Sequence, residues 1–154
     1  MEFLNPHLEP FRPYLGKTWR GTAIGEGAPK VQDISHWERA LNGQAIRILH
    51  SLNNGEYGGE TILMWDEAAE SLTYYYFTTA GFYTHGSMRI EGETFISREE
   101  VSGNAEGITV VEAIGRLLPD GRMESRSRYL QNGVWVEGHA FVYEEDPLAK
   151  VIFR

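Results

Sequence analysis

The stretch TYYYFTTAGFYTHGSMRI, residues 73–90, holds the pattern on which the predicted fold rests. Two runs of alternating residues, rich in aromatic and β-branched side chains, flank the dipeptide Ala80-Gly81. Alternation with a period of two is typical of a strand with one buried face, and a short glycine-containing break between two such runs is typical of a hairpin. We therefore predict two antiparallel strands joined by a tight turn.

The same alternation recurs along the chain, interrupted by turn signals such as Asn42-Gly43, Pro119-Asp120-Gly121 and Asn132-Gly133. Asn-Gly supplies the positive φ angles that a two-residue hairpin turn requires. Ten strands are expected, near residues 17–24, 31–41, 44–53, 58–66, 71–79, 82–90, 94–102, 108–118, 122–131 and 134–144.

Short connections between consecutive strands indicate a meander, which exposes two edges unless the sheet closes on itself. The predicted fold is all-β: a single antiparallel up-and-down barrel of about ten strands. A β-sandwich is the less favoured alternative, because Greek-key crossings usually need longer connections. One domain is expected, with a helical lead-in at 1–16, the barrel at 17–144 and a tail at 145–154. Asn5 is the expected N-cap of the lead-in helix.

The composition excludes several classes of protein. The chain has 154 residues, a net charge of −8 and no cysteine. Clustered basic residues are needed to bind nucleic acid or anionic membranes, and cysteines to form disulfides or thiolate metal sites. The N-terminus lacks a basic start followed by an apolar run, so we expect no signal peptide and a soluble cytoplasmic protein.

The segment FRPYLGKTWRGT, residues 11–22, resembles the opening of calycin barrels, the group of lipocalin, fatty-acid-binding and nitrobindin-like proteins. Gly16 and Trp19 match the segment that closes one barrel end there, with one residue more between them than in lipocalins. The resemblance implies that a late arginine, Arg126 or Arg154, packs on the indole. The strand number is nearer to fatty-acid-binding and nitrobindin-like barrels.

The end of the chain, residues 128–154, is similar to the last hairpin and tail of nitrobindin-like proteins and uncharacterised bacterial relatives. Their haem-binding members carry a proximal histidine in the tail. The matching stretch EDPLAKVIFR, residues 145–154, has none, so haem is not expected and no cofactor is predicted. No HxH, HxxxH or HExxH spacing occurs, so no metal site is predicted.

Turn positions fix which residues share a face. The Asn42-Gly43 turn places Glu38 opposite Arg47, a charged pair that belongs outside, so Trp37 and His50 face inward on the other side. Ser35, Ile46, Ile48 and Leu52 share that inner face, and His36 lies outside.

Late in the chain the turns align Glu112, Arg128 and Glu137 into a ladder of alternating charge, and place Arg126 beside His139. We place the ladder outside, because the opposite face is apolar and small-chained and leaves space for a ligand. The alternative is an inward ladder that binds an anion, as in fatty-acid-binding barrels. An outward ladder also exposes three aromatic residues of the last strand, Trp135, Phe141 and Tyr143, as a possible homodimer surface.

With Ala80-Gly81 as a two-residue turn, Tyr76 lies opposite His85. We place the face with fewer ionisable groups, including Tyr75 and Phe77, inside, and His85 outside. The opposite choice, with His85 in the pocket, stays open.

The leading functional hypothesis is a barrel that binds a small apolar or amphipathic molecule, with no nucleic acid or membrane as partner. The expected ligand-binding residues are Trp37, His50, Met64, Tyr75, Phe77, Met88, Phe95 and Tyr129. One alternative is an enzyme that uses His50 or His85 as general base and a tyrosine as proton donor, although the sequence shows no residue that would orient the histidine. The other is a barrel that serves mainly as an oligomerisation module.

Overall fold

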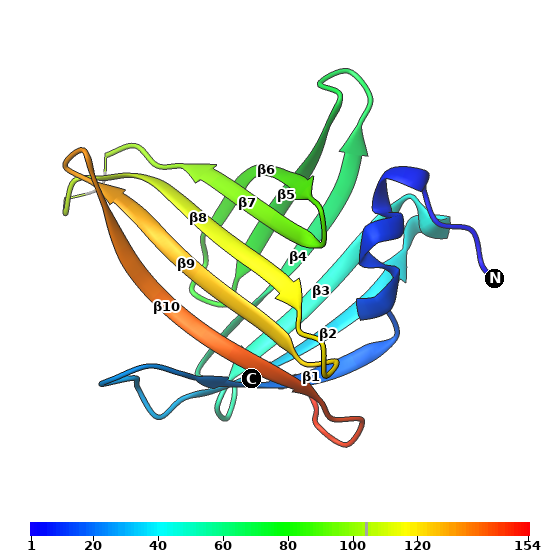
Figure 1. The fold of residues 1–154 in the computed structure, drawn as a ribbon, viewed down its shortest axis with the longest axis horizontal. Coiled ribbons are helices and arrows are strands. Elements are labelled where there is room, and N and C mark those ends of the chain that lie inside the picture. Colours follow the sequence, from blue (N-terminus) through cyan, green and yellow to red (C-terminus); the bar gives the residue numbers. More distant parts are fainter. Residues whose placement is uncertain (104) are drawn as a thin grey trace.

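The computed structural model of the chain describes residues 1–103 and 105–154. Each strand pairs antiparallel with its neighbours in sequence, and the first strand pairs with the last, which closes the sheet into a barrel (Figure 1). The predicted all-β, up-and-down barrel with a short N-terminal helical turn is confirmed.

The strand bounds lie within two residues of the predicted ones. The strands are β1 (Lys17–Ala23), β2 (Gln32–Ala40), β3 (Ala45–Leu52), β4 (Tyr57–Asp66), β5 (Ser71–Thr78), β6 (Tyr83–Glu91), β7 (Thr94–Glu100), β8 (Ile108–Leu117), β9 (Met123–Gln131) and β10 (Val134–Glu145). A short helical turn, η2 (Leu41–Gly43), joins β2 to β3, and the predicted pairing of Glu38 with Arg47 is confirmed.

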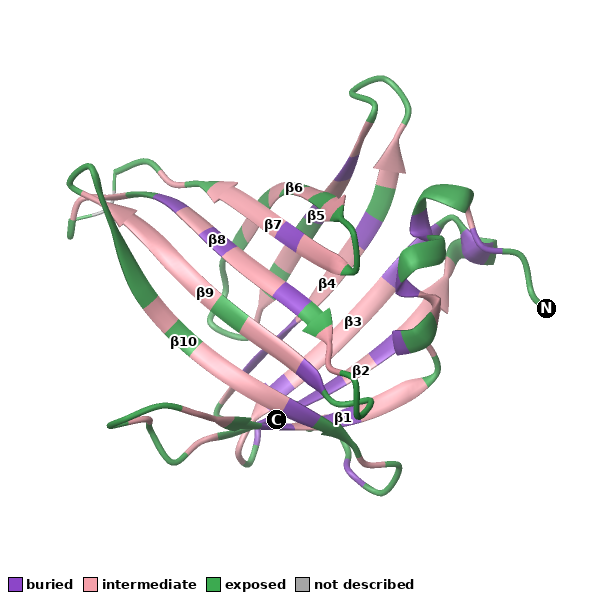
Figure 2. Cartoon of the chain, viewed as in Figure 1, coloured by how far each residue is buried: buried purple, intermediate pink, exposed green. Residues whose placement is uncertain are grey.

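The N-terminal segment forms a 3-10 helix, η1 (Pro6–Tyr14), which lies across one end of the barrel (Figure 1). The side chain of Asn5 accepts a hydrogen bond from the backbone N–H of His7 at 3.0 Å. Pro10 and Pro13 lie inside η1, lack backbone N–H groups and clash with the preceding turn, so a regular α-helix cannot run through this segment. The helix buries the side facing the barrel and exposes the other (Figure 2). We call this end of the barrel the closed end.

Aromatic side chains fill the closed end. Tyr14 stacks on Trp37 at 4.8 Å between ring centroids and meets Phe95 edge-on at 5.6 Å, and Phe11 lies 5.5 Å from Phe95. Trp19 is buried beside Tyr14 at 6.1 Å. Stacked and edge-on ring pairs of this kind add to the free energy gained from burying apolar area.

The cation over Trp19 is Lys17, whose Nζ lies 5.8 Å from the ring centroid. The expected arginine contact is therefore wrong. Arg126 points outward and binds Glu124, while Arg154 donates to the backbone oxygen of Asn54. Arg154 belongs to a tail that packs on the outside of the barrel, where the N–H of Ile152 donates to Ser51.

The charged ladder lies outside. The predicted pairs of Arg128 with Glu112 and with Glu137 are confirmed, and the opposite face of β8 and β9 carries Leu117 and Met123, which pack in the core. Although it is on the outer face, Glu112 is only 3% exposed, because Arg89, Arg98 and Arg128 cover its carboxylate.

A β-bulge in β10 changes the predicted faces of the last strand. The pairing shifts between Glu137 and Ala140, so Arg126 lies opposite Ala140 and not His139. The extra residue turns Tyr143 inward, where it is 8% exposed, and Phe141 packs against the core with it. Trp135 stays outside under Arg128, so the three aromatic residues expected on a homodimer surface do not share a face.

The hairpin at 73–90 has a register one residue from the predicted one. Tyr75, not Tyr76, pairs with His85, because the loop between Thr78 and Phe82 holds three residues and not two. Gly81, at a φ of 88°, takes the left-handed position that such a loop requires. A slip of one residue exchanges the two faces of one strand relative to the other.

Among the described residues, no helix combines the length and apolar character needed to cross a membrane.

Candidate functional site in the barrel lumen

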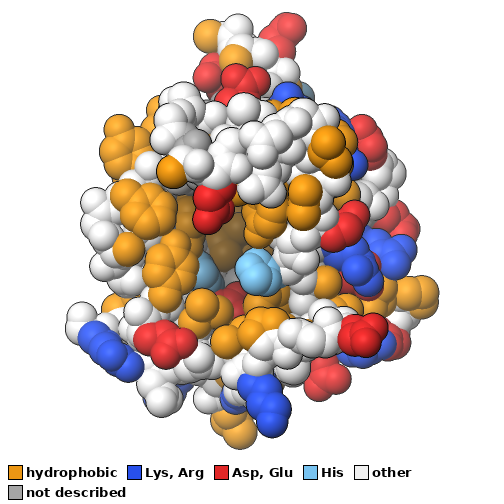
Figure 3. Space-filling view, turned by 90° about the vertical axis from the view of Figure 1, so that its left-hand side faces the viewer, with side chains coloured by type: hydrophobic (Ala, Val, Ile, Leu, Met, Phe, Trp, Pro, Cys, Tyr) orange, Lys and Arg blue, Asp and Glu red, His pale blue; other side chains and the backbone are white. Residues whose placement is uncertain are grey.

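The barrel is hollow at the end opposite η1. Figure 3 shows this open end, with apolar side chains on the floor and rim of the hollow and histidine side chains beside it. The inner face of β8, β9 and β10 is built from small residues over much of its length. These are Ala113, Ser125 and Ser127, together with Gly115 and Gly138, over which the rings of Phe95 and Tyr129 lie. Small side chains on one wall leave volume for a ligand.

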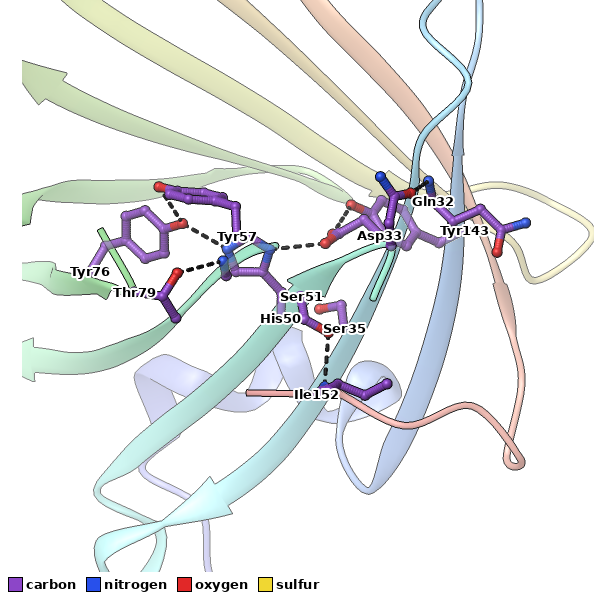
Figure 4. Close-up of polar contacts among 12 residues, drawn as sticks. Gln32, Asp33, Ser35, His50, Ser51, Tyr57, Tyr76, Thr79, Tyr143 and Ile152 are labelled. Carbon is purple, nitrogen blue, oxygen red and sulfur yellow. Dashed lines mark hydrogen bonds and ion pairs between the residues drawn. The ribbon is translucent and has the colours of Figure 1, made fainter. Parts of the chain in front are cut away.

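A chain of hydrogen bonds crosses the opposite wall of the lumen (Figure 4). The hydroxyl of Tyr143 donates to Oδ2 of Asp33 at 2.7 Å, and Oδ1 of Asp33 lies 2.9 Å from Nδ1 of His50. Nε2 of His50 lies 2.7 Å from the hydroxyl of Tyr76, which in turn lies 3.1 Å from the hydroxyl of Tyr57. We call these five residues the lumen hydrogen-bond chain.

The strand register brings the residues of the lumen hydrogen-bond chain together. Ser35 on β2 pairs with His50 on β3, so Asp33, two residues from Ser35 on the same face, is a diagonal neighbour of His50. Two glycines make room for the rings. A Cβ on Gly21 would clash with the ring of Tyr143, and one on Gly59 would clash with the ring of Tyr76.

Both tyrosines in contact with the acid–base pair keep their protons. Burial, and then the charge of Asp33, raises the pKa of Tyr143 well above its ordinary value. Burial, and then the hydrogen bond with Tyr57, raises the pKa of Tyr76. The phenols therefore act as hydrogen-bond donors at neutral pH, not as phenolates.

The charge state of His50 decides which groups donate and which accept along the lumen hydrogen-bond chain. The Asp33 carboxylate accepts a hydrogen bond from Nδ1 of His50, so neutral His50 carries its hydrogen on Nδ1. Its Nε2 then accepts a hydrogen bond from the hydroxyl of Tyr76. When His50 is cationic, Nε2 donates to Tyr76, and Tyr76 donates to Tyr57. The side chain of His50 is 21% exposed and that of Asp33 is 10% exposed, so the pair is sheltered but can be reached from the lumen.

A second polar cluster adjoins the chain on β5, β6 and β7. Thr84 pairs with Tyr76 across β5 and β6, and its hydroxyl lies near enough to the carboxylate of Glu99 to lower the pKa of that carboxyl. Tyr74, the next inward residue of β5, lies close to Ser97. Burial, followed by the charge of Glu99, raises the pKa of Tyr74 to about 12, with Ser97 acting in the opposite direction. Burial also raises the pKa of Glu99, and the nearby hydroxyl of Thr84 offsets part of that effect.

The eight expected ligand-binding residues separate into three places. His50 lies in the lumen hydrogen-bond chain, and the ring of Tyr129 covers Gly138 on the lumen wall. Trp37, Met88 and Phe95 belong to the closed end or pack against it.

The remaining three are wrong as lumen residues. Met64 is 39% exposed, Tyr75 44% and Phe77 48%, on the outer face of the barrel. The core holds their strand neighbours Leu63 and Tyr74. His85 lies on the outer face too, stacked on Tyr75 at 5.4 Å, so it is not available as a base in the lumen.

Sequence reasoning missed four members of the lumen hydrogen-bond chain as site residues, namely Asp33, Tyr57, Tyr76 and Tyr143. For Asp33 a signal existed, since it shares the inner face of β2 with Ser35 and Trp37, and the predicted register placed Ser35 opposite His50. Tyr76 and Tyr143 were hidden by the three-residue loop and by the bulge.

Two grooves lie at the closed end, away from this chain. One of about 670 Å³ runs between η1 and the β6–β7 and β8–β9 turns, with Pro10, Phe95 and Pro119 among its walls, and one of about 270 Å³ lies beside His7, Trp65 and Met88. Neither groove includes a member of the lumen hydrogen-bond chain. Within residues 1–103 and 105–154, no three His, Asp or Glu side chains are placed to hold a metal ion.

Comparison with protein-family models and with curated proteins finds no match for this chain.

Proposed function

We propose that the protein binds a small amphipathic molecule in the barrel lumen, through the open end, and orients it with the lumen hydrogen-bond chain. One observation carries the proposal: a sheltered line of hydroxyl, imidazole and carboxylate groups faces a hollow whose other wall is made of small residues. A few polar groups in an apolar cavity are the usual means of fixing the orientation of a ligand. The barrel shape, together with the Gly16 and Trp19 segment, supports a calycin-like protein.

A ligand reaches the chain at Tyr57. With His50 neutral, the hydrogen of Tyr57 is turned toward Tyr76, and its oxygen is free to accept from the ligand. With His50 cationic, Tyr57 accepts from Tyr76 and donates its own hydrogen to the lumen. The site thus suits a hydroxyl or another group that both donates and accepts.

The test is calorimetric titration with 4-phenylbutan-1-ol. We expect saturable binding that Ala113→Trp abolishes, because Ala113 faces inward in the middle of β8 and an indole there fills the lumen. The matched control is Glu100→Trp, which adds the same ring at an exposed position of β7 and should leave binding unchanged. Equal binding by both variants would place the ligand outside the lumen and contradict the proposal.

A second candidate function, acid–base catalysis in the same lumen, is favoured by the contact between Asp33 and His50. A carboxylate on Nδ1 fixes the tautomer of a histidine and leaves Nε2 basic. Tyr76 then carries protons between Nε2 and the lumen. The chemistry that fits is removal of a proton next to a carbonyl group.

This candidate is tested with 4-phenylbutan-2-one in D2O. If His50 acts as a base, NMR shows deuterium entering the carbon positions beside the carbonyl faster than in buffer, and His50→Gln removes the acceleration. If the ketone binds but its hydrogens exchange with deuterium no faster than in buffer, acid–base catalysis is contradicted and the binding function alone stands.

A further inference from the structure

Among the residues that the structure describes, carboxylates face the lumen and no lysine or arginine side chain does. All 14 basic residues of the sequence lie within the described residues 1–103 and 105–154. Seven project from the outer faces of strands, namely Arg20, Arg47, Arg89, Arg98, Arg116, Arg126 and Arg128. The other seven lie at the closed end, in loops or in the tail, namely Arg12, Lys17, Lys30, Arg39, Arg122, Lys150 and Arg154.

Two carboxylates face inward. Asp33 uses both oxygens within the lumen hydrogen-bond chain. Glu99 follows Phe95 and Ser97 on the inner face of β7 and is half-buried. The hydroxyl of Thr84 lies near it, and the structure pairs it with no lysine or arginine in the described part of the chain. His85, on the outer face, has the smallest of the influences on its pKa.

A half-buried carboxylate without a basic partner loses hydration that no ion pair among the described residues replaces. A ligand can supply the missing partner. The place for it is defined, because Thr84 lies near Glu99 and pairs with Tyr76 across β5 and β6, and Tyr74 is close enough to feel the charge of Glu99. A group bound at Glu99 therefore lies beside the phenol rings of Tyr74 and Tyr76. Phenol faces attract cations as well.

We infer that the polar end of the lumen ligand is a cation, a primary ammonium group that binds between Glu99 and the tyrosines of the lumen. The inference rests on the proposed function and specifies the class of ligand. A carboxylate ligand is disfavoured, because Asp33 and Glu99 both repel it and no lysine or arginine among the described residues lies in the lumen to compensate. The fatty-acid type of ligand that an inward arginine ladder would have bound is therefore not expected.

The test compares three ligands of equal length: 4-phenylbutylamine, 4-phenylbutan-1-ol and 4-phenylbutanoate. Calorimetry at pH 7 and physiological salt should show the amine binding about tenfold more tightly than the alcohol, and the carboxylate more weakly than the alcohol. Glu99→Gln should remove the advantage of the amine and leave the affinity for the alcohol within about twofold.

The control variant is Glu26→Gln, which removes the same charge from the exposed loop between β1 and β2. It should change no affinity, since an exposed carboxylate in salt acts weakly over a distance. A measurement that needs no variant is the nuclear Overhauser effect from the methylene beside the ammonium to Thr84 and Tyr76 in the unaltered protein.

The outcomes separate the two proposals. If the alcohol binds as tightly as the amine, or the carboxylate binds most tightly, the inference is overturned and the proposed function stands. If Glu99→Gln folds and keeps the preference for the amine, the inference is overturned as well. If none of the three ligands binds at millimolar concentration, both proposals fail.

Discussion

The two ends of the barrel are built on opposite principles. At the closed end, η1 presses apolar and aromatic side chains into a core around Trp19, Trp37 and Phe95. At the open end, the lumen wall carries hydroxyl, imidazole and carboxylate groups that bond to one another. Among the described residues, the buried side-chain nitrogen without a partner, Nε1 of Trp19, belongs to the closed end. The closed end is therefore organised by packing and the open end by hydrogen bonds.

The largest expected effect is on the closed end. Phe11→Ala should lower the free energy of unfolding by about 3–5 kcal/mol, because it opens a cavity among Tyr14, Trp37 and Phe95. Urea denaturation measures the change. The matched control is Phe77→Ala on the outer face, where the side chain is 48% exposed and the loss should be under about 1 kcal/mol. Equal losses would mean that η1 does not seal a core.

At the open end, Asp33→Asn should lower the free energy of unfolding by about 2–3 kcal/mol. The carboxylate accepts hydrogen bonds from both Tyr143 and His50, whereas the single oxygen of an amide can accept from only one of them. The variant should also change the tautomer of His50, because its Nδ1 loses a charged acceptor. Nitrogen NMR of the imidazole ring and urea denaturation check the two effects. An unchanged ring spectrum would show that Asp33 does not orient His50.

A smaller effect is expected from Tyr143→Phe, about 1 kcal/mol of stability, because one hydrogen bond to Asp33 is lost and the ring remains. Tyr75→Phe is the control, since that hydroxyl is on the exposed outer face and its removal should have no measurable effect. If both variants unfold at the same urea concentration as the unaltered protein, the bond from Tyr143 adds nothing to stability.

The smallest effect is the pH dependence at Glu99. Burial raises the pKa of this carboxyl in the folded state, so folding favours its protonated form. Stability from this group is present below the unfolded pKa, near 4.5, and is lost as the pH rises through the folded pKa. Glu99→Gln should therefore be more stable than the unaltered protein at pH 7 and lose that advantage near pH 4. Thermal unfolding of both proteins at the two pH values measures the change. A difference in stability that is the same at pH 7 and pH 4 would contradict the prediction.

The sequence predicted the barrel but only part of its interior. Strand bounds and the β2–β3 register followed from alternation and from Asn42-Gly43, which are local. The face of β6 did not, because a break containing Ala80-Gly81 allows a loop of two or of three residues. The bulge in β10 was also hidden, since the contact that accompanies it, between Tyr143 and Asp33 on β2, joins residues far apart in the sequence. The outer face is thus easier to predict than the lumen of this barrel.

The pairing of β1 with β10 has a consequence for how the chain folds. Every other strand pair is a local hairpin, whereas this seam joins Trp19 to Glu145. Local hairpins form early, and contacts distant in sequence form late. During synthesis the edge of β1 therefore waits unpaired until the last strand has emerged, and unpaired edges invite pairing with other chains. The time taken to close one seam sets the period in which this protein is most prone to aggregate.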